Sequence, residues 1–169
     1  RERVRQATVE EIKAVARAQM AAEGTAGVTL RAIARDMGMT APALYRYFGS
    51  RDELVTALVT DAYDALADAM EAAVAAVPAG GHAERMLAAF AAFRRWSLEH
   101  PTEFALIFGS PIPGYQAPAT TRPAGERYTG LLLRLLAEAH GAGALRRGQL
   151  DMGVPPALER QLVAFRERQ

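Results

Sequence analysis

Three side chains that can donate hydrogen bonds follow one another in the first third of the chain, namely Tyr45, Arg46 and Tyr47. They lie in the stretch TAPALYRYFGSRDEL (40–54), on a predicted helix of barely two turns. A phenol hydroxyl and a guanidinium both donate hydrogen bonds to phosphate oxygens, and arginine also binds base edges. The three residues therefore offer the chemistry of nucleic-acid contact rather than that of bond breaking.

Small residues come directly before these donors. At the start of a helix that enters the major groove, Ala41, Pro42 and Ala43 would allow close approach of the backbone and contact with thymine methyl groups. Each tyrosine has an alternative, because Tyr45 or Tyr47 can instead pack against Phe48.

The surrounding segment, 30–49, satisfies the packing demands of a helix-turn-helix. Thr29 can cap a helix over 30–37, which ends at Gly38 because glycine tolerates a positive φ. Thr40 can cap the next helix, with Pro42 in the first turn, where a missing N–H costs nothing. Ala34 allows the helices to cross closely, and apolar residues fill the angle between them: Ile33, Met37, Met39, Leu44 and Phe48. The alternative is a short helical hairpin within an ordinary core.

The remaining pattern is helical almost throughout and predicts an all-α fold. Residues 3–23 carry apolar or small side chains every four residues, at Val4, Thr8, Ile12, Ala16 and Met20. Ser50 and Glu53 predict a capping box at the start of a long fourth helix that extends to about 77. Further helices are expected over 83–99, 102–109, 124–140 and 155–168, with a proline-rich loop over 110–123.

Composition excludes several classes of protein. The chain has 169 residues, no cysteine and a net charge of +1, so it has neither thiolate chemistry nor a strong overall field. No apolar run approaches the roughly 20 residues of a membrane span, and no secretory signal opens the sequence. We expect a cytoplasmic protein that does not enter a membrane, and because the first residue is Arg1, a native start upstream of it.

Neither metal binding nor catalysis is expected. His82, His100 and His140 are far apart and lack the spacing of a helical metal pair. The fourth helix has an acidic face, which we expect to be exposed to solvent. It consists of Asp61, Asp64, Asp68 and Glu71. No phosphate-binding glycine loop, serine nucleophile or acid/base pair is present, so we expect no cofactor and no enzyme.

The segment VTLRAIARDMGMTAPALYRYFGSRDEL (28–54) resembles the DNA-binding signature of the TetR-type transcriptional repressors. That signature has an Ile-Ala pair, a Gly-apolar-Ser/Thr turn, a Leu-Tyr-x-x-Phe helix and then Ser-Lys/Arg-x-x-Leu. Its elements are present here as Ile33-Ala34, Gly38-Met39-Thr40, Leu44-Tyr45 with Phe48, and Ser50-Arg51 with Leu54. The resemblance covers about residues 8–56.

The resemblance implies double-stranded operator DNA as a partner. The residues that it assigns to DNA binding are Thr29, Arg31, Thr40, Ala41, Pro42, Ala43, Tyr45, Arg46, Tyr47 and Arg51. Thr29, Tyr45 and Arg51 would bind phosphates, Arg51 standing where the family usually has lysine. Arg1, Arg3 and Arg5 form either a basic arm along the DNA or a frayed charged terminus.

The stretch EHPTEFALIFGSPIPGYQAP (99–118) resembles the C-terminal domain of the WHG-type subgroup. This implies a helix-turn-helix domain over 1–50, joined by the long fourth helix to a ligand-binding and dimerisation domain over 51–169. Eleven large apolar side chains are candidates for lining an effector cavity, although they can equally be solid core: Met70, Met86, Phe90, Phe93, Trp96, Phe104, Ile107, Phe108, Tyr115, Tyr128 and Leu132. They would suit a small hydrophobic or flat aromatic effector.

The family mechanism implied is that of a homodimeric repressor on a palindromic operator, released when an effector moves the fourth helix. Relatives in this subgroup usually end in an apolar helix with a Trp and a His-Gly element, and this chain reaches Gln169 without one. The sequence therefore does not decide which helices form the dimer, and the candidates are 124–140 and 155–169. A helical protein-interaction module without DNA binding is the alternative function, and an α-helical enzyme is a further one.

Overall fold

The computed structural model describes residues 1–145, 156, 160, 161 and 163, and the described part is helical without strands. The helix expected over 155–168 lies outside the continuously described residues. The elements are, in order, α1 (Glu2–Glu23), α2 (Leu30–Asp36), α3 (Ala41–Tyr45), α4 (Arg51–Ala75), α5 (His82–Glu99), α6 (Pro101–Phe108), a 3₁₀ turn η1 (Ala119–Thr121) and α7 (Arg122–Gly141). The all-α prediction is confirmed.

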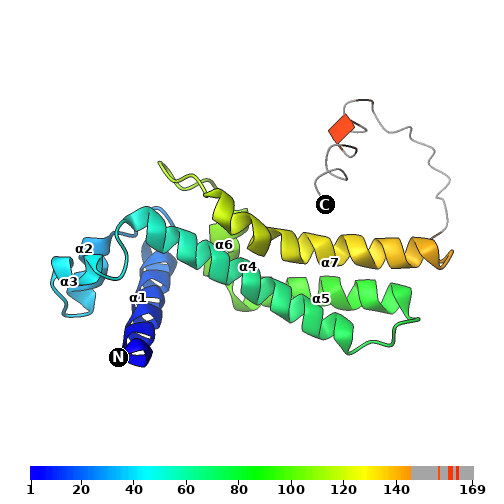
Figure 1. The fold of residues 1–169 in the computed structure, drawn as a ribbon, viewed down its shortest axis with the longest axis horizontal. Helices are drawn as coiled ribbons and strands as arrows, with labels where there is room; N and C mark the ends of the chain where they lie inside the picture. The colour runs from blue at the N-terminus through cyan, green and yellow to red at the C-terminus, as the bar shows by residue number, and fades with distance from the viewer. Residues whose placement is uncertain (146–155, 157–159, 162, 164–169) are drawn as a thin grey trace.

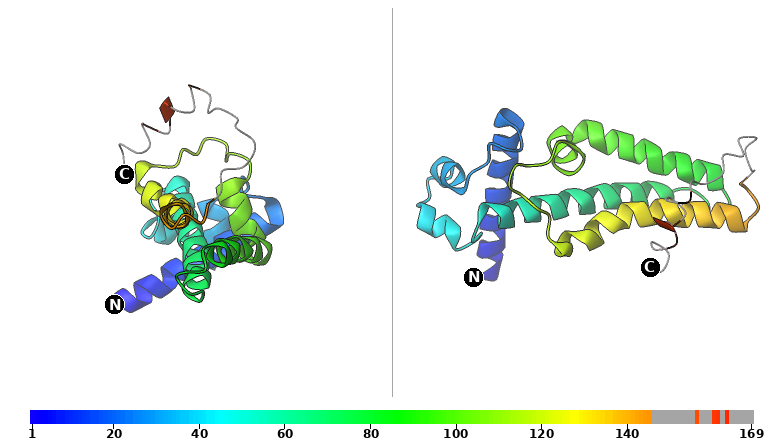
Figure 2. Two further views of the ribbon diagram at one scale, coloured as in Figure 1. Left: turned by 90° about the vertical axis from the view of Figure 1, so that its right-hand side faces the viewer. Right: turned by 90° about the horizontal axis from the view of Figure 1, so that it is seen from above.

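The long helix α4 connects the two halves of the molecule (Figure 1). Its first turns lie beside α1, α2 and α3, and its remaining length lies between α5 and α7, as the view from above also shows (Figure 2). The helix α5 runs back along α4, and α7 runs in the same direction as α4. None of the described helices is both long and apolar enough to cross a bilayer.

The N-terminal half has a core of its own. Ile12 and Ala16 of α1, Ile33 of α2, Leu44 of α3 and Leu54 of α4 are all fully buried there. Burying a side chain of this size stabilises the fold by about 1.5–3 kcal/mol, so α3 is fixed by its neighbours rather than by its own five residues. The stripe predicted for α1 is only partly right, because Val4 is 67% exposed where the helix projects beyond this core.

A second core lies between α4, α5 and α7. Its buried members are Ala62, Leu66, Met70, Val74, Ala89, Ala92, Trp96, Leu131 and Leu135. Phe93, Phe104 and Phe108 pack against one another beside it, with ring centroids 5.2–6.4 Å apart. The α5–α6–α7 half is therefore filled mainly by close-packed apolar side chains.

The acidic face of α4 is paired rather than merely solvated, which corrects the sequence-based interpretation. Arg127 of α7 donates hydrogen bonds to Asp64 at 2.9 Å, Asp68 at 2.7 Å and Glu71 at 2.9 Å. The hydrogen bonds that Arg127 donates to Asp68, Asp64 and Glu71 raise the pKa of its guanidinium further above the ordinary value. One guanidinium therefore joins α7 to three successive acids of α4.

The fourth acid, Asp61, joins the two halves of the molecule. Its carboxylate accepts hydrogen bonds from Lys13 at 2.7 Å and Arg17 at 3.0 Å, both on α1. Arg17 also lies 3.5 Å from the carboxylate of Glu103 on α6. Burial opposes the charged form of Lys13, but its hydrogen bonds to Asp61 and Glu10 outweigh that effect and raise the pKa of the ammonium.

The predicted loop over 110–123 is wrong in its last third, because η1 and the start of α7 occupy residues 119–123. Pro123 stands at the second position of α7, where its missing N–H leaves no helical bond unmade. Prolines in this stretch therefore mark a helix start as well as a loop.

Candidate functional site

The turn between α2 and α3 positions the exposed face of α3. Gly38 has a φ of 64°. Its N–H donates a hydrogen bond to the carbonyl of Arg35 at 3.1 Å, and the N–H of Met39 donates one to the carbonyl of Ala34 at 2.8 Å. This is a Schellman motif, which ends a helix with a residue in the left-handed region. The predicted role of Gly38 is confirmed, and the sharp reversal sends the chain directly into α3.

The inner and outer faces of α3 differ in burial. Leu44 is fully buried and Phe48, just after the helix, is 7% exposed, so both hold the segment to the core. Ala41 and Ala43 are half-buried, whereas Pro42, Tyr45 and Arg46 are exposed, Tyr45 by 45%. No other part of the described chain seals this surface, so a duplex can reach it.

The helix α3 is shorter than expected, because Arg46 and Tyr47 lie in the turn that follows it. There the N–H of Tyr47 bonds the carbonyl of Leu44 at 2.8 Å, three residues back, before Ser50 takes an extended conformation. The tighter turn lets the chain enter α4, whose first turn is capped by the Ser50 hydroxyl on the Glu53 N–H at 3.1 Å. The Glu53 carboxylate bonds the Gly49 N–H and not that of Ser50, so the predicted capping box is displaced by one residue.

A basic groove adjoins this surface. It has a volume of about 340 Å³ and is lined by Arg1, Glu2, Arg5, Met39, Ala43, Arg46 and Tyr47. The Arg5 guanidinium lies 5.6 Å from the centre of the Tyr47 ring, in cation–π range. Arg3 and Arg5 belong to α1 itself and Arg1 directly precedes it, so the basic N-terminus is part of a helix instead of an extended arm.

The other predicted DNA contacts flank the same region. The Thr29 hydroxyl caps α2 by accepting a hydrogen bond from the Ala32 N–H at 3.2 Å, and Arg31 is exposed in the same first turn. Thr40 holds the N-cap position of α3 without a side-chain cap bond. Arg51 is already engaged, since it donates to the carbonyls of Val28 at 3.0 Å and Ala26 at 3.2 Å and so ties the loop before α2 to α4.

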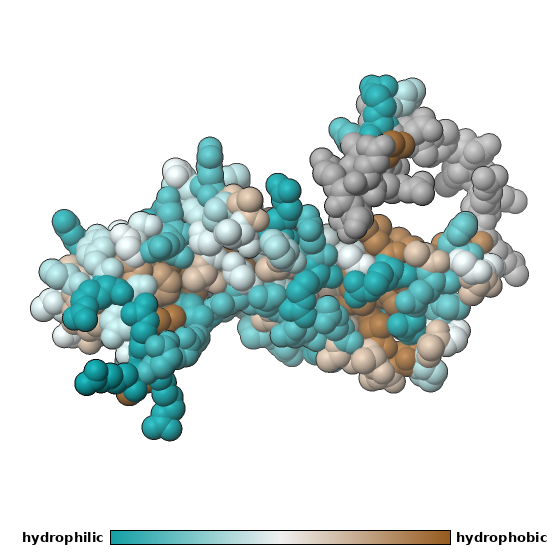
Figure 3. Space-filling model, in the orientation of Figure 1, coloured by the Kyte–Doolittle hydropathy of each residue, from teal (hydrophilic) through white to brown (hydrophobic). Residues whose placement is uncertain are grey.

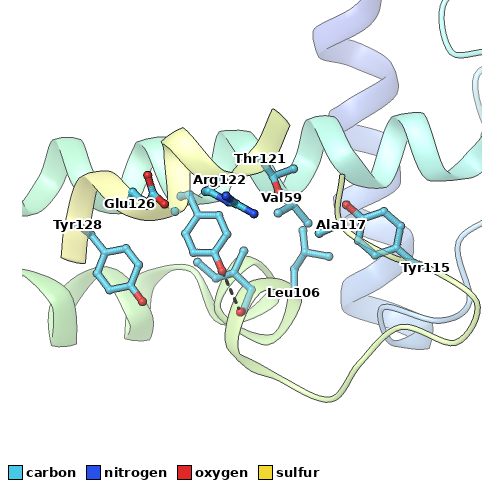
Figure 4. A pocket seen from close by; sticks show the side chains of 11 residues that line it. Val59, Leu106, Tyr115, Ala117, Thr121, Arg122, Glu126 and Tyr128 are labelled. Carbon is cyan, nitrogen blue, oxygen red and sulfur yellow. Dashed lines mark hydrogen bonds between the residues drawn. The ribbon is translucent and has the colours of Figure 1, made fainter. Parts of the chain in front are cut away.

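The C-terminal half contains a pocket of about 360 Å³ between α4, α6, α7 and the loop before η1 (Figure 4). Of the eleven side chains predicted to line an effector cavity, Ile107, Tyr115 and Tyr128 line this one. Met70 and Trp96 are buried in solid core, and Phe108 contacts the rings of Phe93 and Phe104. Four further candidates pack against that core: Met86, Phe93, Phe104 and Leu132. Phe90 is 53% exposed on the outer face of α5.

The sequence did not indicate the rest of this lining: Val59, Tyr63, Leu106, Ala117, Thr121, Arg122, Gly125 and Glu126. The signal for the position of the pocket lay in the loop. Large apolar residues among its prolines, Ile112 and Tyr115, indicate a segment that packs against the body of the protein. Ile112 is 6% exposed within the N-terminal core, and the Tyr115 hydroxyl lies 3.1 Å from that of Thr56 on α4. The loop thus touches both the pocket and the core that supports α3.

Two family models match the chain in the regions just described. The model described as "Bacterial regulatory proteins, tetR family" matches residues 12–58. The model described as "Tetracyclin repressor-like, C-terminal domain" matches residues 86–166. The chain belongs to the TetR family. The WHG-type subgroup stays a prediction.

The individual relatives are named as HTH-type transcriptional regulators. The chain is 40% identical over 131 residues to HTH-type transcriptional regulator Rv1816 of Mycobacterium tuberculosis and to its counterpart Mb1846 of Mycobacterium bovis. The match covers 77% of this chain but only 56% of each relative, so the chain spans little more than half their length. These names describe transcriptional regulators and not enzymes.

Solved structures place the whole described architecture in the same fold. The crystal structure of the protein SCO4313 has a TM-score of 0.73 at 37% identity, covering 99% of this chain and 82% of that one. The TetR-family regulator PfmR of Thermus thermophilus has a TM-score of 0.66 over 82% of this chain and 75% of its own, at 21% identity, which is a likeness of fold alone. Within the described residues, no group of three or more acidic or histidine side chains is placed to hold a metal.

Proposed function

We propose that this TetR-family protein binds double-stranded operator DNA through α3 and the turn that follows it, and acts as a transcriptional repressor. The carrying observation is the surface of α3, where Pro42, Tyr45 and Arg46 are exposed above the buried anchors Leu44 and Phe48. A surface held this rigidly can meet base edges and phosphates without first being ordered.

Each donor has a distinct proposed role. Pro42 and the neighbouring alanines lie against the groove, Arg46 reaches a base edge or phosphate, and the Tyr45 hydroxyl donates to a phosphate. Thr29 and Arg31 contact the flanking backbone from the start of α2. Since Arg51 already binds two carbonyls, we assign it to holding the loop that carries Thr29, with any phosphate contact secondary.

We further propose a homodimer on a palindromic operator. The face of α7 opposite the buried Leu131 and Leu135 carries Leu133 and Leu136, which are 46% and 45% exposed. Apolar side chains gather over α5 and α7 on the face seen in Figure 3. A second copy packed against such a face would place two reading surfaces for half-sites about 34 Å apart.

Release by a small effector is the proposed regulatory step. A compound in the pocket would contact Tyr115 and Ala117 of the loop, whose residue Ile112 belongs to the core that supports α3. Movement of the loop and of α4 would change the spacing of the two reading surfaces, and a duplex accepts only one spacing.

Operator affinity of an arginine variant tests the DNA-binding proposal. DNA selected from a random pool supplies the ligand, and Arg46→Ala is compared with Arg35→Ala, an exposed arginine on α2. We expect Arg46→Ala to weaken binding by about tenfold or more and to lower the salt slope by about 1 per site, with Arg35→Ala close to wild type. Equal affinities for the three proteins would refute the assignment and favour a protein-interaction module.

A further inference from the structure

The pocket beside the proline-rich loop combines aromatic walls with an apolar floor. Tyr63, Tyr115 and Tyr128 lie along its length, while Val59, Leu106 and Ile107 form much of the remaining lining. The rings of Tyr63 and Tyr128 are nearly parallel, 5° apart, with their centres separated by 6.0 Å. A cavity of about 360 Å³ is at the small end of the range for ligand sites, so it suits a compact molecule.

One charged side chain extends over this apolar space. Figure 4 shows the Arg122 guanidinium lying over the pocket beside Thr121 and Val59, while the Glu126 carboxylate on the rim is directed away. Arg127 on the same helix binds three acids, whereas Arg122 forms no ion pair within the described part of the chain. The pocket thus has a cationic group whose anionic partner the described protein does not supply.

The tyrosine hydroxyls complement this charge. Burial raises the pKa of the Tyr63 and Tyr128 phenols, with a smaller contribution at Tyr63 from the neighbouring tyrosines. Both phenols are therefore protonated at neutral pH and can donate hydrogen bonds. The Tyr63 hydroxyl has only a long contact of 3.5 Å to the carbonyl of Ile107, so an incoming acceptor competes with a weak bond.

We propose that this pocket binds a small carboxylic acid with a flat aromatic or short alkyl body. The carboxylate pairs with Arg122, and the apolar body lies against Tyr63, Tyr128 and Ile107. This names the class of effector for the ligand-responsive function proposed above, and its regulatory meaning rests on that function. A cationic ligand is disfavoured by Arg122, and a neutral one forms no ion pair with this exposed guanidinium.

A charge-matched set of compounds tests the proposal. Isothermal titration at neutral pH without DNA compares 2-naphthoate, 2-naphthamide and 2-naphthylmethylammonium, which share one ring system, and octanoate with octanamide as the alkyl pair. The proteins are wild type, Arg122→Gln, and Arg95→Gln as a control, since Arg95 is an exposed arginine of α5 outside the pocket.

We expect at least one carboxylate to bind wild type about fivefold more tightly than its amide, as an ion pair with an exposed arginine allows, and the ammonium compound to bind most weakly. Arg122→Gln removes this preference, while Arg95→Gln retains it and both variants keep wild-type helix content. A carboxylate that binds no better than its amide, a preference that survives Arg122→Gln, or no binding by either acid at millimolar concentration would overturn the proposal.

DNA affinity measured in parallel separates this inference from the proposed function. Arg122-dependent binding of the acid that leaves DNA affinity unchanged supports the carboxylate site and refutes effector release. If the neutral amide releases DNA as effectively as the acid does, a ligand-responsive regulator is supported and the carboxylate class of effector is overturned.

Discussion

Replacing Arg127 by glutamine should destabilise the protein more than any other exchange of an exposed polar residue on α7. Its guanidinium lies 2.9, 2.7 and 2.9 Å from the carboxylates of Asp64, Asp68 and Glu71. In Arg127→Gln these acids face one another on adjacent turns of α4 without a counter-charge. The ion pairs are lost and a like-charge repulsion is left behind.

The magnitude follows from the exposure of the groups. The Arg127 side chain is 36% exposed and Asp68 is 70% exposed, so each pair is worth only about 0.2–1 kcal/mol. Repulsion between acids three or four residues apart adds a few tenths of a kcal/mol each. We expect a total loss of about 2 kcal/mol in the free energy of unfolding at low salt.

Urea unfolding followed by helical circular dichroism measures this loss at one fixed protein concentration. Arg134→Gln, an exposed arginine of the same helix, is the matched control for helix propensity. The loss in Arg127→Gln should shrink by about half near 1 M salt, where the screening length is about 3 Å. A loss equal to that of Arg134→Gln, or one independent of salt, would refute this explanation of how α7 is held.

Two further predictions concern the turn at Gly38 and the ionisable groups whose pKa is raised in the folded state. Gly38→Ala should lower the free energy of unfolding by about 1 kcal/mol, because the φ of Gly38 is 64° although the space around it is open. Gly80 is equally open but has no positive φ, so Gly80→Ala should change that free energy by about a few tenths of a kcal/mol at most. Similar losses for the two variants in thermal unfolding would contradict this. The pKa values of Tyr63, Tyr128 and Lys13 are raised in the folded state, so the folded protein keeps these protons to a higher pH than the unfolded one. Stability should therefore be constant near neutrality and fall above about pH 10. Stability that rises above that pH would be inconsistent with the burial described.

Local signals in the sequence predict the helix-turn-helix well. Gly38, the Thr29 cap and the buried Leu44 and Phe48 all follow from rules that act within a few residues, and each is found in its expected place. The length of α3 does not follow from these rules, because the turn into α4 tightens the chain after Tyr45.

Pairings across the fold could not be predicted in the same way. An acidic face on one helix looks solvated until the position of Arg127, about sixty residues away in the chain, is known. The pocket likewise depends on a loop that returns to α4 through Tyr115 and Thr56. Large apolar side chains on α5 are equally compatible with core and cavity, and the packing of three helices decides between them.

The central claim is that the exposed face of α3 lies against DNA, and a single attached probe tests it most directly. Because the chain contains no cysteine, Pro42→Cys gives one attachment site for a thiol-linked photocrosslinker, and Ala91→Cys on the exposed face of α5 gives the control. Each labelled protein is mixed with selected operator DNA and irradiated. We expect the probe at position 42 to form a crosslink to the duplex and the probe at position 91 to form no crosslink. Crosslinking from position 91 but not from 42, in proteins that both retain DNA binding, would contradict the account.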